Sequence, residues 1–191
     1  EKNIEAPQEV RSLAALFTAR SLVSQGQIDP ALELLNTIRQ GEIGGESVDF
    51  IKISLLLQAE RPAEADAIAQ NLSRTAGERR DKVLFRKLIR YYQDRLQFDQ
   101  ALALCDKEEQ LFPQDPEPYL LRASVLEGQN RWEEAVACYR RAKDLQPGMF
   151  TIYRSLTRAL NRLQQPQQAL EVLAELEKSG QSGWSEAMFA K

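Results

Sequence analysis

Histidine is absent from this 191-residue sequence, and cysteine, methionine and tryptophan each occur only twice. The commonest general base and metal ligand is therefore missing. The two cysteines, Cys105 and Cys138, are 33 positions apart and form neither a zinc pattern nor a disulfide framework. Both lie among apolar helical positions, where a thiol behaves as a small hydrophobic group, so we expect two unbridged core residues. No apolar run approaches the roughly 20 residues that cross a bilayer.

Motifs for chemistry are also missing. The sequence contains no glycine-rich phosphate loop, no nucleophile motif and no cluster of metal ligands. Carboxylates such as Glu133 and Glu134 are expected on helix faces without a convergent partner, where solvation is the simpler role. We therefore expect a protein that is not an enzyme, with no catalytic residue, no metal and no cofactor.

Neither sign of charge dominates. Lysine and arginine total 25 against 28 aspartates and glutamates, which gives a net charge of -3. Residues 1–81 hold 9 basic and 13 acidic side chains, and residues 82–191 hold 16 and 15. Neither part is the cationic footprint that nucleic-acid binding requires, which argues against nucleic acid as a partner. Hydrophobic residues make up 43% and charged residues 28%, as in folded proteins.

The chain opens EKNIEAPQEV, without methionine or an apolar run. We expect no secretory signal in this stretch and interpret the chain as a processed form or a piece of a longer protein. The compartment is therefore unknown, and cytoplasmic and periplasmic locations both stay open.

A repeat of about 34 residues organises the sequence. It is marked by five alanines, which are Ala31, Ala65, Ala101, Ala135 and Ala169. Their separations are 34, 36, 34 and 34 residues. Nine residues before each alanine stand Leu22, Leu56, Tyr92, Leu126 and Leu160. Further apolar or small side chains follow at spacings of three and four, which predicts one apolar stripe on each of two helices.

Each unit is thus predicted to be an antiparallel helix pair joined by a short turn. Pro113 and Pro147 fall where second helices should end, and Pro62 and Pro166 fall where they should begin. No segment alternates long enough to predict a strand. Because one pair cannot bury both stripes alone, we expect the pairs to stack as an array.

These residues resemble the tetratricopeptide repeat (TPR) family. The match is closest in the unit that carries Tyr119, Ala123, Trp132, Ala135 and Pro147. The unit from Lys82 and the last unit are also good matches, while the two N-terminal units are weaker. The likeness covers about residues 12–183. We expect an N-terminal extension (1–11), five repeats (12–45, 46–81, 82–115, 116–149 and 150–183), and a capping helix or the start of a further repeat (184–191).

The resemblance implies an all-α, right-handed solenoid whose first helices line a concave groove. It also implies a non-catalytic scaffold that binds a peptide or protein segment. The family's clamp for chaperone C-termini does not fit, because the equivalent positions hold residues such as Leu16, Ile51 and Val83. We therefore expect no chaperone-terminus receptor.

Projecting the first helices onto the concave side gives a candidate groove with apolar residues early and cations late. Its members are Leu16, Phe17, Arg20, Phe50, Ile51, Ser54, Arg86, Lys87, Arg90, Leu121, Arg154 and Arg158. This pattern favours a ligand with an apolar anchor and acidic residues. The alternative is that the apolar members belong to the core and that the arginines form a solvated helix face.

Two charged residues stand at core-type positions, Glu108 on a second helix and Arg122 on the next first helix. One interpretation pairs them across the boundary between repeats, because an unpaired buried charge is costly. The other is that both reach solvent independently.

Two functions remain open. The favoured one is a protein-binding scaffold that recruits a peptide or holds an assembly together. The other is a structural or self-association module, such as a homodimer, within a larger enzyme or envelope-export protein.

Overall fold

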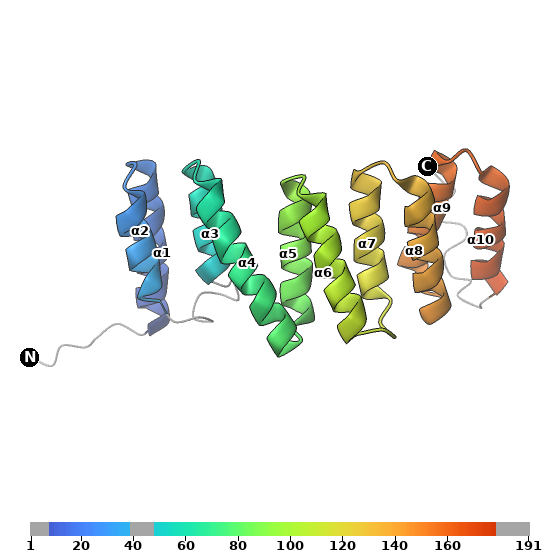
Figure 1. Ribbon diagram of the computed structural model, residues 1–191, viewed down its shortest axis with the longest axis horizontal. Coiled ribbons are helices and arrows are strands. Elements are labelled where there is room, and N and C mark those ends of the chain that lie inside the picture. Colours follow the sequence, from blue (N-terminus) through green and yellow to red (C-terminus); the bar gives the residue numbers. More distant parts are fainter. Residues whose placement is uncertain (1–7, 39–47, 179–191) are drawn as a thin grey trace, which may run out of the picture. The chain divides into compact units, whose positions relative to one another are not determined.

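The computed structural model describes residues 8–38 and 48–178, and every regular element among them is an α-helix (Figure 1). The chain forms two compact units, residues 1–72 and residues 73–191. The ten helices in the described ranges are α1 (Gln8–Ser24), α2 (Ile28–Asn36), α3 (Val48–Gln58), α4 (Pro62–Arg79), α5 (Lys82–Asp94), α6 (Phe98–Leu111), α7 (Glu117–Gly128), α8 (Trp132–Leu145), α9 (Phe150–Arg162) and α10 (Pro166–Lys178). The prediction of an all-α array of helix pairs is confirmed. The predicted capping residues 184–191 lie outside the described ranges.

In residues 1–72, α1 packs against α2, and α2 contacts α3. The apolar stripes predicted from the repeat meet in one core cluster. Its buried members are Leu16, Ala19, Val23, Ala31, Leu35, Ile38, Val48, Ile51 and Leu55. Near the surface, Arg61 pairs with Asp29 at 2.6 Å and with Glu64, in the first turn of α4, at 2.5 Å.

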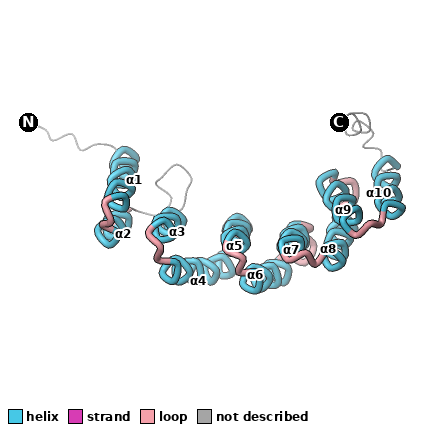
Figure 2. The backbone as a smooth tube through the Cα atoms, turned by 90° about the horizontal axis from the view of Figure 1, so that it is seen from above, coloured by secondary structure: helices cyan, strands magenta, loops and turns pink. Residues whose placement is uncertain are grey.

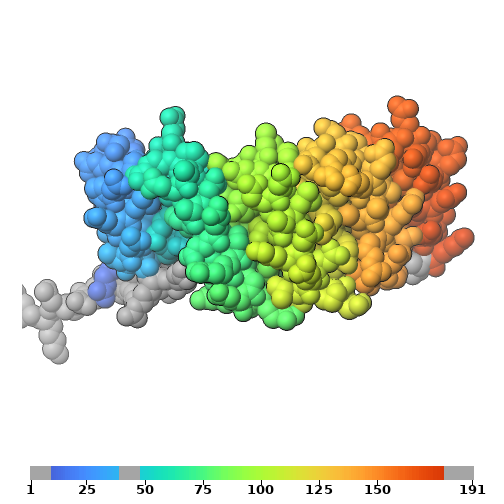
Figure 3. Space-filling model, in the orientation of Figure 1, coloured from blue at the N-terminus to red at the C-terminus, as the bar shows by residue number. Residues whose placement is uncertain are grey.

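In residues 73–178, three helix pairs follow one another: α5 with α6, α7 with α8, and α9 with α10. Figure 2 shows α5, α7 and α9 in one layer and the second helices in the other. Side chains fill the spaces between these ribbons (Figure 3). Each second helix also packs against the first helix of the next pair, so the stripes of neighbouring pairs cover one another.

The repeat alanines explain the close packing within each pair. Ala31, Ala65, Ala101 and Ala135 are completely buried, and Ala169 is nearly so. A methyl group at this position lets the two helix axes approach closely. The alanine spacing in the sequence therefore reports a steric requirement of the pair.

The turn inside each pair is a repeated helix C-cap. The residues with positive φ in these turns are Gly26, Glu60, Leu96, Asn130 and Gln164, which keep the 34- and 36-residue spacing of the alanines. The residue after each one donates its N–H to the carbonyl five residues earlier, as Gln97 does to Tyr92 at 2.8 Å. This 6→1 bond is the Schellman motif, and it satisfies a carbonyl that the helix end leaves open.

The predicted pairing of Glu108 with Arg122 is wrong. Arg122 donates instead to Asp106 at 2.5 Å and to Glu109 at 2.7 Å. Glu108 is completely buried, and neither of its carboxylate oxygens has a hydrogen-bond partner. The position of each carboxylate around the axis of α6 explains why Arg122 does not pair with Glu108. Asp106 and Glu109 are three residues apart and share the face towards α7, whereas Glu108 lies on the core stripe of α6.

The alternative for Glu108, escape to solvent, is also wrong, because its side chain has no exposed surface. Equivalent positions in other repeats hold Ile38, Leu72 and Ala142, all of them buried. Burial raises the pKa of Glu108 to about 7, since the charged form loses its hydration. Glu117 and Asp115 raise it further, while Arg86 and Lys82 act in the opposite direction.

Both cysteines are free, as predicted. Cys105 is buried, and loss of hydration raises the pKa of its thiol to about 12. Cys138 is half-buried. No helix in the described ranges is long and apolar enough to span a membrane.

Candidate protein-binding face

The candidate site is the face that α5, α7 and α9 present in residues 73–178, called here the first-helix face. On α5 it carries Arg86, Arg90 and Gln93, whose spacings of four and three place them on one side of the helix. On α9 it carries Arg154 and Arg158, again four residues apart.

Polar contacts between side chains join these helices. Arg86 of α5 pairs with Glu117 of α7 at 2.9 Å. The Gln93 amide donates to the hydroxyl of Ser124 of α7 at 3.1 Å. These two contacts pair charged and polar side chains on neighbouring first helices and hold α5 and α7 against each other.

The polar contact between α7 and α9 also involves a side chain of α8. Arg158 of α9 pairs with Glu127 of α7 at 2.8 Å. Tyr139 of α8 is buried, and Glu127 and Ser155 lie close enough to its hydroxyl to influence its pKa. Burial raises the pKa of Tyr139 well above its ordinary value, so the phenol stays protonated and can donate to the carboxylate.

Two cations on this face are left without a carboxylate. Arg90 and Arg154 are exposed, and neither forms an ion pair with any residue that the structure describes. Each lies one helical turn from an arginine that is paired, Arg86 or Arg158. The four arginines therefore comprise two neutralised guanidinium groups and two without a carboxylate, on either side of α7.

Apolar surface accompanies these charges. Val83, in the first turn of α5, is 60% exposed, and Leu121 of α7 is half-buried. Lys87 is a further exposed cation on α5. The first-helix face thus combines positive charge with modest apolar area. Such a surface is complementary to an acidic, partly apolar ligand.

Of the predicted groove members in residues 1–72, two belong to the core. Leu16 and Ile51 are buried in the same cluster, so their assignment to a ligand surface is corrected. They lie on the stripes of α1 and α3 that meet α2, and burial there excludes a ligand. Phe17 is 66% exposed, Arg20 and Ser54 are exposed, and Phe50 is half-buried.

Sequence reasoning missed the acidic partners of the paired arginines. The pairs Arg86–Glu117, Gln93–Ser124 and Glu127–Arg158 are each separated by 31 residues. That separation is one repeat less one helical turn, so it joins neighbouring first helices on a single face. A search for opposite charges at this spacing would have found both ion pairs.

Within the described part of the chain, no group of three or more metal-ligating side chains comes together. The arrangement on the first-helix face offers charge and shape for binding a partner.

No family model matches the sequence, and no curated protein matches it. Solved structures do resemble it. MamA from Desulfovibrio magneticus RS-1, from residue 41 to its end, is 17% identical, with 90% of this chain and 98% of that chain covered and a TM-score of 0.53. MamA AMB-1 is 16% identical over 96% and 99% of the two chains, with a TM-score of 0.51.

A protein from Podosopora anserina, described as a kinesin light chain with nearly identical TPR-like repeats, is 17% identical. The likeness covers 94% of this chain and all of that chain, with a TM-score of 0.54. At these identities the likeness concerns the fold. The chain has the all-α, TPR-like solenoid fold.

Proposed function

We propose that this chain is a non-catalytic protein-interaction scaffold, and that its first-helix face binds an acidic segment of a partner protein. Stacked helix pairs expose one side of every first helix, which gives a continuous surface for a partner. The neighbours of similar fold, MamA and the kinesin light chain repeats, are consistent with this class of function.

The observation that carries the proposal is the division among the four arginines. Arg86 and Arg158 are already neutralised by Glu117 and Glu127. Arg90 and Arg154 are exposed without a carboxylate among the described residues, so two carboxylates of a partner segment can each form a charge-assisted contact there. Val83 and Leu121 offer apolar contact beside them.

The test uses a fluorescent eight-residue peptide of alternating glutamate and leucine, and a matched peptide with glutamine for glutamate. We expect the glutamate peptide to bind more tightly, with an affinity that falls as salt is added. The charge reversals Arg90→Glu and Arg154→Glu should each weaken binding by about tenfold or more.

The matched control is Lys107→Glu, which makes the same change of charge at an exposed position of α6, outside this face. It should leave the affinity within about twofold of the unchanged protein. Equal binding of the two peptides, or equal affinity of all three variants, would reject the proposal.

A second candidate function, self-association, is favoured by one observation in residues 1–72. Val10, Leu13 and Phe17 lie on one side of α1 and are 52%, 46% and 66% exposed. Apolar patches of this kind often mark an interface. A mass that rises with concentration in sedimentation, and that becomes constant in Phe17→Ser, would support self-association, whereas a constant monomer mass in the unchanged chain would reject it.

A further inference from the structure

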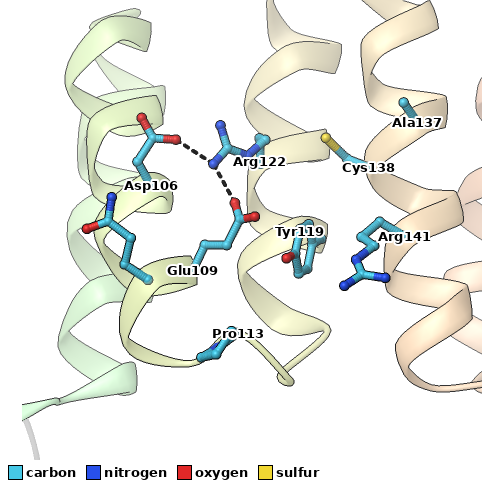
Figure 4. Close-up of a pocket in the computed structure, with 9 residues that line it drawn as sticks. Asp106, Glu109, Pro113, Tyr119, Arg122, Ala137, Cys138 and Arg141 are labelled. Atoms are coloured by element: carbon cyan, nitrogen blue, oxygen red, sulfur yellow. Dashed lines mark hydrogen bonds and ion pairs between the residues drawn. The ribbon is translucent and has the colours of Figure 1, made fainter.

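A cleft of about 750 Å³ opens on the side of residues 73–178 that the second helices form (Figure 4). α6 and α8 are its walls, and α7 is its floor. It is separate from the first-helix face. Its lining residues are Asp106, Glu109, Gln110, Pro113, Tyr119, Arg122, Ala137, Cys138 and Arg141.

In the next gap along the array, direct bridges connect α8 to α10. Lys143 of α8 forms an ion pair with Glu175 of α10. Arg140 of α8 donates to the Gln168 side chain of α10 at 2.6 Å. These two contacts tie the second helices of adjacent pairs together.

At the positions equivalent to Lys143 and Glu175, one repeat earlier, α6 and α8 carry charges of the opposite sign. Thirty-four residues before Lys143 stands Glu109, and thirty-four residues before Glu175 stands Arg141. An ion pair of reversed polarity is therefore available across the cleft. It does not form, and no hydrogen bond or ion pair joins the side chains of α6 and α8, both of which lie within the described ranges.

Arg122 of α7 prevents Glu109 from pairing with Arg141. It stands where the repeat has Leu88 and Leu156, both completely buried, and its guanidinium draws Glu109 to 2.7 Å and Asp106 to 2.5 Å. Both carboxylates of α6 thus turn towards the floor instead of towards α8. Figure 4 shows the two dashed contacts converging on Arg122.

Arg141 is consequently left exposed at the cleft, without a carboxylate among the described residues. Its guanidinium lies 5.9 Å from the ring centroid of Tyr119. Contact with the aromatic ring positions the Arg141 side chain in advance, which lowers the entropy cost of binding a ligand there.

We propose that this cleft binds an acidic side chain of a partner protein segment, with Arg141 receiving the carboxylate. The carboxylate takes the role opposite Arg141 that Glu175 has opposite Lys143 in the next gap. An apolar side chain next to the acid lies against Tyr119, Ala137 and Cys138. The charged rim and partly apolar floor match the composition of a protein interface.

The test uses two capped dipeptides, acetyl-Glu-Leu-amide and acetyl-Gln-Leu-amide, titrated into the full chain and followed by amide chemical shifts. We expect the glutamate peptide alone to shift the amides of α6, α8 and Tyr119. Arg141→Met should weaken that binding by at least about tenfold. The matched control Arg140→Met removes a neighbouring charge that serves the other gap and should leave the affinity unchanged.

Arg122→Leu tests the mechanism with Arg141 intact. Leucine occupies the equivalent positions of α5 and α9, so the variant is expected to fold. It releases Glu109 to pair with Arg141, which should close the cleft and abolish binding. Arg90→Glu and Arg154→Glu should not affect binding at this site, so failure here and failure of the first-helix face are distinguishable.

The proposal is overturned by any of four results. These are equal shifts from the glutamine peptide, undiminished binding by Arg141→Met, shifts confined to α5, α7 and α9, and no shift from the glutamate peptide at its solubility limit. Retained binding by Arg122→Leu would overturn the role assigned to Glu109.

Discussion

Arg122 of α7 and Glu109 of α6 form an ion pair between successive helix pairs, with Nη2 and Oε2 2.7 Å apart. The neighbouring residue, Glu108, points into the core of the same helix pair and has no partner for either carboxylate oxygen. Two adjacent glutamates thus have opposite surroundings, one paired and accessible, the other buried and alone. The difference has consequences for stability that can be measured.

Glu108 should make the chain less stable as the pH rises. Its pKa is about 7 in the folded protein against an ordinary value of 4.5, so between these values the folded state holds a proton that the unfolded state has lost. The free energy of unfolding should therefore fall from pH 4.5 to pH 7 and change little above that through this group. Glu108→Gln should remove this slope and be more stable at pH 8 by about 3 kcal/mol, measured by urea denaturation.

Below pH 4.5 Glu108 is protonated in both the folded and the unfolded state. Glu108→Gln and the unchanged chain should therefore have nearly equal free energies of unfolding. Glu133→Gln on the exposed surface of α8 is the control and should alter neither stability nor slope. A slope that survives in Glu108→Gln would contradict the assignment.

Leu96→Gly should stabilise the chain. Leu96 has φ +57° in the turn between α5 and α6, and its side chain is 73% exposed. A leucine in this left-handed region costs about 1–2 kcal/mol, part of which glycine loses again through its freer unfolded chain. We expect a gain of about 0.5–1 kcal/mol in the free energy of unfolding, measured by thermal or urea denaturation.

Asn130 occupies the equivalent turn between α7 and α8, with φ +59°. Asparagine tolerates this conformation, so Asn130→Gly should change stability less than Leu96→Gly does. A loss of stability in Leu96→Gly would mean that the leucine side chain contributes packing that outweighs its backbone strain.

Truncation of two leucines should separate the core from the exposed side of the last described pair. Leu156 of α9 is completely buried, so Leu156→Ala should cost about 2–5 kcal/mol in unfolding experiments. Leu170 of α10 is 64% exposed, and Leu170→Ala should stay within about 0.5 kcal/mol of the unchanged chain. Equal losses would indicate that another part of the chain, or a second molecule, covers Leu170.

Much of the architecture could be predicted from the repeat. The alanine spacing located the turns and the paired helices, because a methyl group is required wherever the two helices of a pair approach closely. The candidate groove was less accessible to sequence reasoning. Leu16 and Ile51 were projected onto a surface, yet they lie in the core, since an apolar side chain at the edge of a stripe can turn either way.

The sequence by itself determined the helices, their pairing and their order, since these depend on contacts within about 34 residues that recur five times. The tertiary structure decided which charges are neutralised, as with Arg86 and Arg158, and which remain for a ligand, as with Arg90, Arg154 and Arg141. A long charged side chain has several partners within reach, and helical phase in the packed neighbours selects one. Periodicity places a residue on a helix face, but only the facing helix fixes what it meets.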